Sequence, residues 1–228
     1  MSRQNKCKQC GKKFKNISLH WASNKNCDYR PLTNRQKEIS KGMLMGDAYI
    51  NIQSGANGML RAKMINKNFL QWLDKELEPF SSNLETYMTA QESFDSASER
   101  FENSVTSVDN YSEIYEYRSC RHPYFTELRD WYKDGKKRFP ENIELTPLSA
   151  KVWMCCDGSV SHKNGKRVNI YSVNEKDRPE YLKSLLDQFN PVWVESSSSI
   201  RIGASDYDEF FEWVGQPLPG FEYKWGDQ

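Results

Sequence analysis

Residues Gly42-Met43-Leu44-Met45-Gly46-Asp47-Ala48 form the most informative segment of this chain, and a second segment, Val152-Trp153-Met154-Cys155-Cys156-Asp157-Gly158, repeats its pattern 110 positions later. In each, an apolar helical run with small residues four apart ends on one aspartate. A carboxylate at the carboxyl end of a helix faces the negative end of the helix dipole, which costs roughly 0.3–1 kcal/mol. Because the chain does this twice, the pattern indicates that a positive group lies at both helix ends.

The two glycines of the first segment point to a close helix crossing. Gly42 and Gly46 lie on one helix face, and each costs about 1 kcal/mol relative to alanine in a helix interior. Small residues let two helices approach with little side chain between them, and Val152 and Cys156 occupy the matching places in the second segment. We therefore expect the two helices to cross, with Asp47 and Asp157 side by side near a pseudo-twofold axis.

Two converging carboxylates without a neighbouring histidine favour a hard divalent cation such as Mg²⁺ (or Mn²⁺). Such an ion activates water and stabilises the attacking and leaving oxygens of phosphodiester hydrolysis. For one segment alone, an aspartate that caps or hydrogen-bonds a turn is the better interpretation. The matched pair, Asp47 and Asp157, favours a metal site.

Composition predicts a folded protein with a very uneven charge distribution. The 228 residues are 13% aromatic, contain no apolar run of about 20 residues, and begin without a secretory leader, so we expect an intracellular chain in the cytoplasm or nucleoid. Residues 1–41 carry eleven basic and two acidic side chains, a net +9, whereas residues 78–116 carry one basic and nine acidic ones, a net −8. The basic end suits a polyanionic partner, although solvated charge alone could explain either block.

Four potential metal ligands lie near the amino terminus with the spacing C-x2-C-x9-H-x6-C: Cys7, Cys10, His20 and Cys27. Gly11 allows the turn that directs the first two sulfurs at one ion, and a structural Zn²⁺ needs four such ligands. The alternative is a basic tail with incidental thiols. The pair Cys155 and Cys156 lies in an apolar helical run and is interpreted as small buried side chains.

The hydrophobic pattern predicts one order of elements twice: helix, strand, strand, helix, strand, strand, helix. The fold class is therefore α+β, with two pseudo-symmetric halves, residues 33–140 and 141–228, after a zinc-finger-like module at 1–30. A long solvated loop or hairpin tip is expected between residues 90 and 114. The expected helices are 34–46, 69–77, 122–132, 147–157, 178–189 and 207–214, and the expected strands are 49–53, 59–64, 84–90, 114–119, 160–162, 168–173, 192–195 and 200–202.

These residues resemble the LAGLIDADG homing endonucleases over about residues 35–226. Residues 40–48 and 150–158 match the family motif, with Asp47 and Asp157 at its metal-binding acid. Further matches lie at residues 118–123, 131–137, 145–148 and 219–225. The first motif departs from the family by carrying Ala48 in place of the usual glycine, and Cys155 and Cys156 are atypical beside the acid.

The resemblance implies a monomeric, pseudo-dimeric enzyme that cuts both strands of a long, nearly palindromic DNA site. Its two antiparallel sheets would form a saddle over the major groove, where base edges are distinguishable. Basic residues near the metals would be Lys63, Lys137 (with Lys136 as a rival) and Lys224, which could neutralise charge on the phosphate. Candidate base-reading residues, each of which could instead be an ordinary exposed strand residue, are Asn51, Gln53, Arg61, His162, Arg167 and Asn169.

Three other functions stay open on sequence grounds. An RNA maturase that assists intron splicing, or a DNA-binding regulator, could use the same scaffold. A structural zinc protein with a dimer-like core is the third. In the endonuclease interpretation, the basic zinc module adds salt-sensitive phosphate contacts without necessarily reading sequence.

Overall fold

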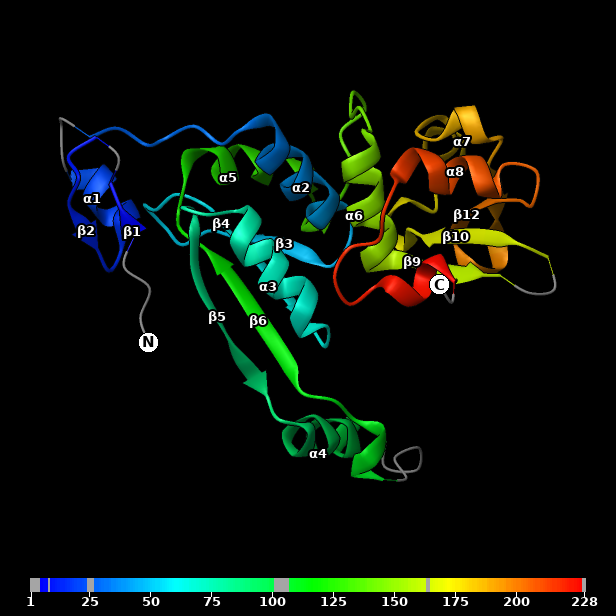
Figure 1. Cartoon of the computed structure of the whole chain (residues 1–228), viewed down its shortest axis with the longest axis horizontal. Coiled ribbons are helices and arrows are strands. Elements are labelled where there is room, and N and C mark those ends of the chain that lie inside the picture. The colour runs from blue at the N-terminus through cyan, green and yellow to red at the C-terminus, as the bar shows by residue number, and fades with distance from the viewer. Residues whose placement is uncertain (1–4, 8, 24–26, 101–106, 163–164, 227–228) are drawn as a thin grey trace. The chain divides into compact units, whose positions relative to one another are not determined.

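The computed structural model describes residues 5–7, 9–23, 27–100, 107–162 and 165–226 (Figure 1). Two compact units organise the chain. Unit 1 contains residues 1–31 and 48–126, and unit 2 contains residues 32–47 and 127–228. The helix of the first motif therefore belongs to unit 2, together with the helix of the second motif.

Unit 1 is built on a four-stranded antiparallel sheet in the order β3 (Ala48–Asn51), β4 (Met59–Met64), β6 (Ile114–Ser119) and β5 (Ser81–Met88). Side chains alternate along the strands, so that Ile50 and Leu60 are buried while Arg61 points to the other face. The helix α3 (Lys67–Glu76), capped by Asn66, covers the buried face with Phe69, Leu70 and Leu73. The sheet thus has one apolar and one polar face.

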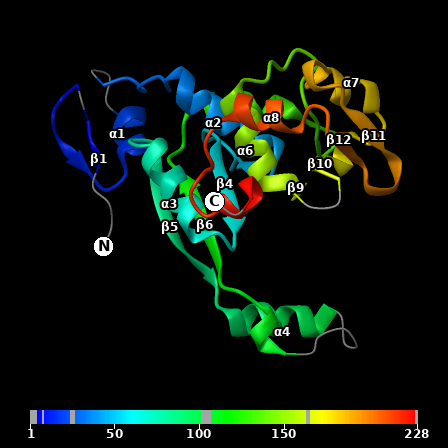
Figure 2. The ribbon, with the colours of Figure 1, turned by 45° about the vertical axis from the view of Figure 1, so that its right-hand side comes forward.

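The helix α4 (Ala90–Arg100) lies at the far end of the β5–β6 hairpin, where the sequence predicted a long solvated loop or a hairpin tip (Figure 2). The segment lies at the tip, but it is helical because a capping box starts the helix. The Glu92 carboxylate accepts from the Thr89 amide at 2.7 Å, and Thr89 Oγ1 accepts from the Glu92 amide at 3.2 Å. Phe94 packs edge-on against Tyr111, next to the 3-10 turn Val108–Asn110.

Two other predicted helices are shorter than expected. The segment 122–132 forms α5 (Pro123–Glu127) followed by the 3-10 turn Leu128–Trp131. The segment 178–189 forms α7 (Pro179–Ser184) and the 3-10 turn Asp187–Phe189, which ends at Asn190 in the left-handed conformation. Hydrophobic periodicity continues through such tighter turns, which is why it overestimates the length of a helix.

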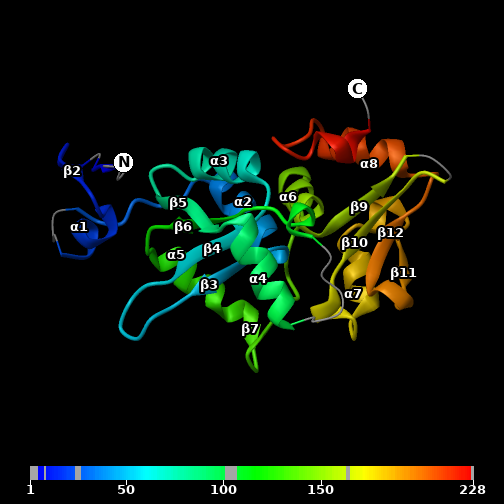
Figure 3. The same ribbon diagram turned by 90° about the horizontal axis from the view of Figure 1, so that it is seen from below.

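Unit 2 repeats the sheet of unit 1. Its strands pair antiparallel in the order β9 (Gly158–Ser161), β10 (Arg167–Tyr171), β12 (Ser199–Ile202) and β11 (Val192–Val194), which is the same connectivity as β3-β4-β6-β5 (Figure 3). This confirms the predicted mixed helix and antiparallel-sheet fold and its internal repeat. A short hairpin, β7 (Tyr132–Lys133) and β8 (Lys136–Lys137), and the helix α8 (Tyr207–Val214) complete the unit.

A small module precedes the first sheet and packs within unit 1. It contains β1 (Asn5–Lys6), β2 (Lys13–Phe14) and α1 (Ile17–Ser23). Trp21 contacts Phe80 with ring centroids 6.0 Å apart, and the His122 ring hydrogen-bonds the Arg30 carbonyl at 2.8 Å. Among all the helices in the described residues, none has the length and apolar character needed to cross a membrane.

Candidate functional site

The helices α2 (Asn34–Met45) and α6 (Pro147–Asp157) cross in unit 2 with their backbones in contact. A β-carbon on Gly42 would lie 2.5 Å from the Ser149 carbonyl oxygen and 2.7 Å from Val152 Cβ. At Gly46, an added β-carbon would overlap Cys156 Cβ. The two glycines are therefore required by the crossing, at the positions that the sequence pattern indicates.

Both helices begin with the same device. Thr33 and Gln36 form a capping box at the start of α2, and Thr146 and Ser149 form one at the start of α6. Reciprocal capping satisfies the first free amides and fixes where each helix starts. The carboxyl ends, and the acids on them, are thereby fixed as well.

Asp47 and Asp157 form one site at the carboxyl ends of the two helices. Asp157 is the last residue of α6, and Asp47 follows Gly46, the residue that ends α2. A β-carbon on Gly46 would lie 3.7 Å from Asp157 Oδ2, so the second acid reaches the end of the first helix. The positions agree with the expectation that the crossing brings both carboxylates together.

The environment of the two acids favours their protonated forms. Burial and, next, the charge of Asp47 raise the pKa of Asp157 to about 7. Burial also raises the pKa of Asp47, even though part of its side chain remains exposed. The charges of Lys137 and Lys224 oppose both shifts, so the site holds two acids and two bases in close electrostatic contact.

Lys224 neutralises the carboxyl end of α6. Its ammonium is buried and donates to the carbonyl oxygens of Cys155 at 2.6 Å, Gly158 at 2.7 Å and Met154 at 3.1 Å. The three carbonyls lie in the last turn and cap of α6, and that of Met154 also accepts from the Gly158 amide. A lysine is thus one positive group at this helix end, where sequence reasoning expected a metal ion.

Lys137 serves the end of α2 in a similar way. It extends from β8, and its ammonium donates to the Gly46 carbonyl oxygen. Burial lowers the pKa of Lys137, and the charge of Asp157 partly offsets this. Its neighbour Lys136 is exposed, which separates the two lysines that the sequence left as rivals.

Lys63 lies in unit 1, on β4. Its ammonium lies 3.3 Å from the centre of the Tyr87 ring, a cation–π contact with β5, which is separated from β4 in the sheet by β6.

The donor set at the helix ends fits a hard divalent cation. Burial raises the pKa of both carboxylates, and the charge of Asp47 raises that of Asp157 further. Such a pair gains from a bound dication, which favours the ionised forms. Oxygen ligands with open access to solvent suit Mg²⁺, which keeps several waters. Asp47 and Asp157 are the residues that would hold it.

On the polar face of the unit 1 sheet, Asn51 and Arg61 lie on adjacent strands, β3 and β4. The Arg61 guanidinium binds the buried carboxylate of Glu116, with Nε 3.0 Å from Oε1. Gln53 follows β3, and its Oε1 accepts from Arg121 at 2.6 Å. The three predicted reading residues of unit 1 thus lie on or beside one sheet edge.

The polar face of the unit 2 sheet carries Arg167 and Asn169, opposite Ser161 and Ser159. Asn169 Oδ1 accepts from Arg201 Nε at 2.8 Å, and a hollow of about 400 Å³ lies over these side chains. Sequence reasoning missed Arg201, as it missed Glu116 and Arg118 in unit 1. The alternation of β6 and β12 was the only available signal, and it does not show which residues meet across strands.

The structure places His162 apart from the other candidate reading residues. It follows β9, and strand alternation places its side chain on the same face of the sheet as Val160 and on the face opposite to Ser159 and Ser161. Its ring nitrogens contact the Tyr207 hydroxyl at 2.5 Å and the Tyr223 carbonyl at 3.3 Å. The side chain therefore joins α8 and the carboxyl-terminal segment to the sheet.

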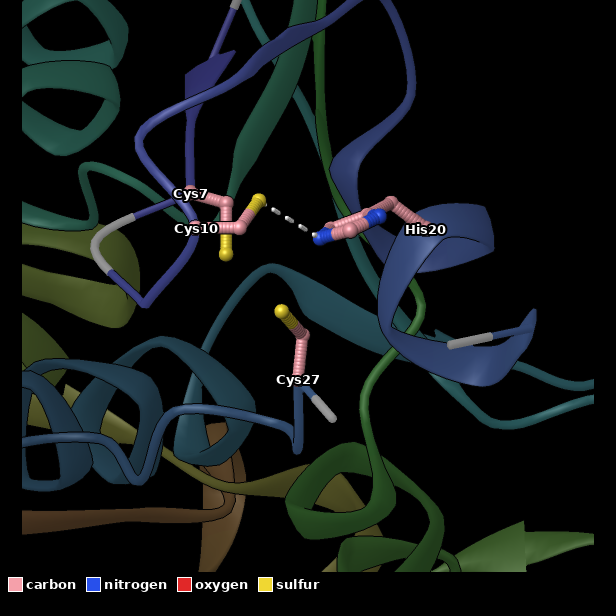
Figure 4. A group of neighbouring side chains, drawn as sticks. All are labelled: Cys7, Cys10, His20 and Cys27. Carbon is pink, nitrogen blue, oxygen red and sulfur yellow. Dashed lines mark hydrogen bonds between the residues drawn. The ribbon is translucent and has the colours of Figure 1, made fainter. Parts of the chain in front are cut away.

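The four amino-terminal candidates, Cys7, Cys10, His20 and Cys27, converge on one point (Figure 4). Their ligand atoms all lie within 4.8 Å of one another, and Cys10 Sγ is 3.5 Å from His20 Nε2. The turn between the first two thiols closes with a bond from the Gly11 amide to the Cys7 carbonyl at 2.8 Å, and Gly11 has a φ of +71°. Phe14 stacks on the His20 ring at 3.8 Å and holds it in place.

The thiol chemistry of this cluster suits a metal ion. Burial raises the pKa of Cys7, but hydrogen bonds from the backbone amides of Cys10 and Gln9 outweigh it and bring the pKa to about 6. Burial and then hydrogen bonding with the other thiols raise the pKa of Cys27 to about 11. Three sulfurs and one imidazole at this separation match a tetrahedral Zn²⁺ site, and a dication would favour all three thiolates.

Comparison with known proteins gives consistent matches. The model of the LAGLIDADG DNA endonuclease family matches residues 37–199. The cytochrome b mRNA maturase bI2 of Debaryomyces hansenii is 24% identical over 218 residues, which cover 87% of this chain and 76% of that protein. An uncharacterized protein of Methanocaldococcus jannaschii is 23% identical over 151 residues, 64% of this chain and 54% of that protein.

Among solved structures, the homing endonuclease I-WcaI bound to its DNA recognition sequence has a similar fold. The TM-score is 0.71 with 19% sequence identity, and the match covers 91% of each chain.

Proposed function

The chain belongs to the LAGLIDADG DNA endonuclease family, and on this premise we propose that it is a homing endonuclease that cleaves both strands of a long, nearly palindromic DNA site. The observation that carries the proposal is the pairing of Asp47 and Asp157 at the ends of two helices whose backbones touch. One chain supplies both acids, so a monomer is sufficient for double-strand cleavage.

Asp47 and Asp157 would hold Mg²⁺ or Mn²⁺. When bound, the metal supplies an activated water and charge stabilisation for phosphodiester hydrolysis. Lys137 and Lys224 bind backbone carbonyls at the two helix ends, and their charges partly offset the burial that raises the pKa of both acids. We assign Lys63, Lys137 and Lys224 the further role of offsetting the charge of the phosphate backbone.

The polar faces of the two sheets would read base edges in the major groove, through Asn51, Gln53 and Arg61 in one half-site and Arg167 and Asn169 in the other. The contacts of His162 with Tyr207 and Tyr223 favour a supporting role for that residue instead. The amino-terminal module, folded around Zn²⁺ at Cys7, Cys10, His20 and Cys27, would add phosphate contacts through its lysines.

Separate measurements of binding and cleavage test the proposal. The substrate is the uninterrupted form of the site that carries the protein's gene, or a site selected from randomised duplex DNA. Asp47→Asn and Asp157→Asn each retain the carboxyl group's shape and are expected to abolish double-strand cleavage while DNA affinity stays within about threefold. Asp208→Asn, at an exposed acid of unit 2, is the control and should cut normally. Full cleavage by either active-site variant would refute the assigned site.

RNA maturation is a second candidate, favoured by the 24% identity to a protein named as an mRNA maturase. Maturase activity would depend on RNA binding and not on Asp47. We therefore expect that, if it exists, Asp47→Asn protein still accelerates splicing of the intron that encodes it. No acceleration by wild-type protein over a range of Mg²⁺ concentrations would exclude this function.

A further inference from the structure

Glu116 is a fully buried carboxylate on the polar face of the unit 1 sheet, with 0% of its side chain exposed. Arg61 on β4 binds its Oε1 through Nε at 3.0 Å and also through Nη2. Arg118, two residues along β6, binds Oε2 through Nε at 2.6 Å and also through Nη2. One carboxylate thus holds two guanidinium groups, each by two nitrogens.

The position of Glu116 is poorly explained by stability. A buried carboxylate loses its hydration, and ion pairs of this kind are often no more stabilising than well-packed apolar side chains. Binding through two nitrogens instead favours a role in orientation, because it fixes the plane of a guanidinium as well as its location. Arg61 and Arg118 are paired in register across β4 and β6, so the two fixed planes lie side by side.

We propose that Glu116 is a positioning residue that orients Arg61 and Arg118 to read guanines at two neighbouring base pairs of one half-site. An arginine recognises guanine by a two-point contact to O6 and N7, which requires a defined orientation of the guanidinium plane. The inference rests on the proposed DNA-cleaving function and adds to it the base preference of these positions. Glu85, half-exposed, binds only Arg118 of the two, at 2.8 Å.

The second sheet lacks this arrangement at the equivalent positions. Strand register pairs Ala48 with Ala62 and Ala62 with Tyr117 in unit 1, and Gly158 with Ile170 and Ile170 with Ile200 in unit 2. By this correspondence, three residues of unit 2 replace Arg61, Arg118 and Glu116 in that order: Asn169, Arg201 and Ser199. A single arginine held by an amide predicts one guanine preference in the second half-site, so the target departs from a palindrome at these base pairs.

Selection from randomised duplex DNA tests the proposal. The reference is the full chain with Asp47→Asn, which binds without cutting. Adding Glu116→Gln keeps the shape of the side chain but removes its charge and one acceptor. We expect the preference for guanine at two neighbouring positions to fall at least tenfold, while the other half-site is unchanged. That unchanged half-site also serves as the internal control for folding.

Glu85→Gln is the matched control. It removes an acidic contact from Arg118 alone, so any change should be confined to one of the two positions. Arg61→Lys and Arg118→Lys retain positive charge without the planar two-point donor, and each should lose guanine preference at one position.

The outcomes separate the inference from the function on which it rests. If the reference protein enriches no sequence, the proposed function fails. If it enriches a site but Glu116→Gln leaves both guanine preferences intact, the role of Glu116 is refuted. If Glu116→Gln does not fold, the two lysine variants decide: retention of guanine at both positions overturns the inference.

Discussion

Gly46 of α2 packs directly against Cys156 of α6, and a β-carbon placed on Gly46 would lie 3.0 Å from the cysteine sulfur and even closer to its β-carbon. This contact joins the two acid-bearing helices near their carboxyl ends. Since Asp47 and Asp157 each follow one of these residues, the separation of the acids depends on the absence of a side chain at Gly46. Packing at the crossing and chemistry at the site are therefore linked.

Gly46→Ala should weaken both folding and cleavage. Overpacking of this kind costs about 1–3 kcal/mol, and each kcal/mol lowers the Tm of a chain of this size by about 2–4 °C. Gly46→Leu should be nearly as damaging to cleavage as loss of Asp47. Thermal unfolding and single-turnover cleavage measure the two effects.

Two further variants test whether the effect of Gly46→Ala comes from its contact with Cys156. Gly203→Ala adds a β-carbon in open space at an ordinary backbone conformation, and its Tm should change by less than about 2 °C. Cys156→Gly vacates the space that the methyl group added by Gly46→Ala would need, so the double variant should be more active than Gly46→Ala alone. If the two effects simply add, the helices do not touch at this point.

Asp157 should lower the stability of the metal-free protein at neutral and higher pH. Its folded pKa of about 7 lies above the ordinary value of about 3.9, so the folded state binds the proton more tightly than the unfolded chain. The resulting stabilisation is complete below about pH 4 and is lost as the pH rises through 7. Asp157→Asn, which stays neutral, should have a higher Tm than wild type at pH 8 and a similar one at pH 4.

Addition of Mg²⁺ tests whether the ionisation of Asp157 causes this pH dependence of stability. Adding Mg²⁺ at pH 8 should raise the Tm of wild type, because the dication favours the ionised pair, and should raise that of Asp157→Asn much less. Measurement is by calorimetry in magnesium-free buffer without chelator, so that the amino-terminal cluster keeps its metal. Equal melting curves for the two proteins at pH 8 would contradict the raised pKa.

Lys224 should be needed for the ionisation of Asp157 as well as for the end of α6. Lys224→Met removes a donor from three carbonyl oxygens, of which that of Met154 keeps the Gly158 amide, at a cost of about 1–3 kcal/mol or more. It also removes a charge that lowers the pKa of Asp157, so the midpoint of Mg²⁺ affinity against pH should move to higher pH. Lys136→Met, at an exposed position, should leave the midpoint unchanged. A loss of stability without a shift in the midpoint would limit Lys224 to a structural role.

The sequence predicted the parts of the fold that depend on local pattern. Small residues four apart identified the crossing of α2 and α6, and alternation identified the strands of both sheets. The helix α4 was missed because an acidic, serine-rich stretch masks the Thr89–Glu92 capping box. The contacts of Glu116 with Arg61 and Arg118 depend on register between strands far apart in the chain, which periodicity does not specify.

The position of His162 follows from strand alternation. Its ring is in phase with Val160 and therefore lies on the face opposite Ser159 and Ser161, where it contacts Tyr207 of α8. The family resemblance implied basic residues near the two acids, but only the fold shows that Lys224 binds carbonyls at the end of α6.

Zinc should be required for the amino-terminal module to stay packed on unit 1. Purified protein is expected to contain one Zn²⁺ per chain, and Cys27→Ser should lose it, whereas Cys120→Ala, at a buried thiol outside the cluster, should keep it. Because so short a segment has little core of its own, loss of the metal should unfold it and separate Trp21 from Phe80. Hydrogen exchange of residues 5–31 measures this directly.

The salt dependence of DNA affinity should also become shallower when the metal is removed, because lysine–phosphate contacts are lost. Full protection of the module after zinc removal would show that packing against Phe80 and His122 alone maintains it.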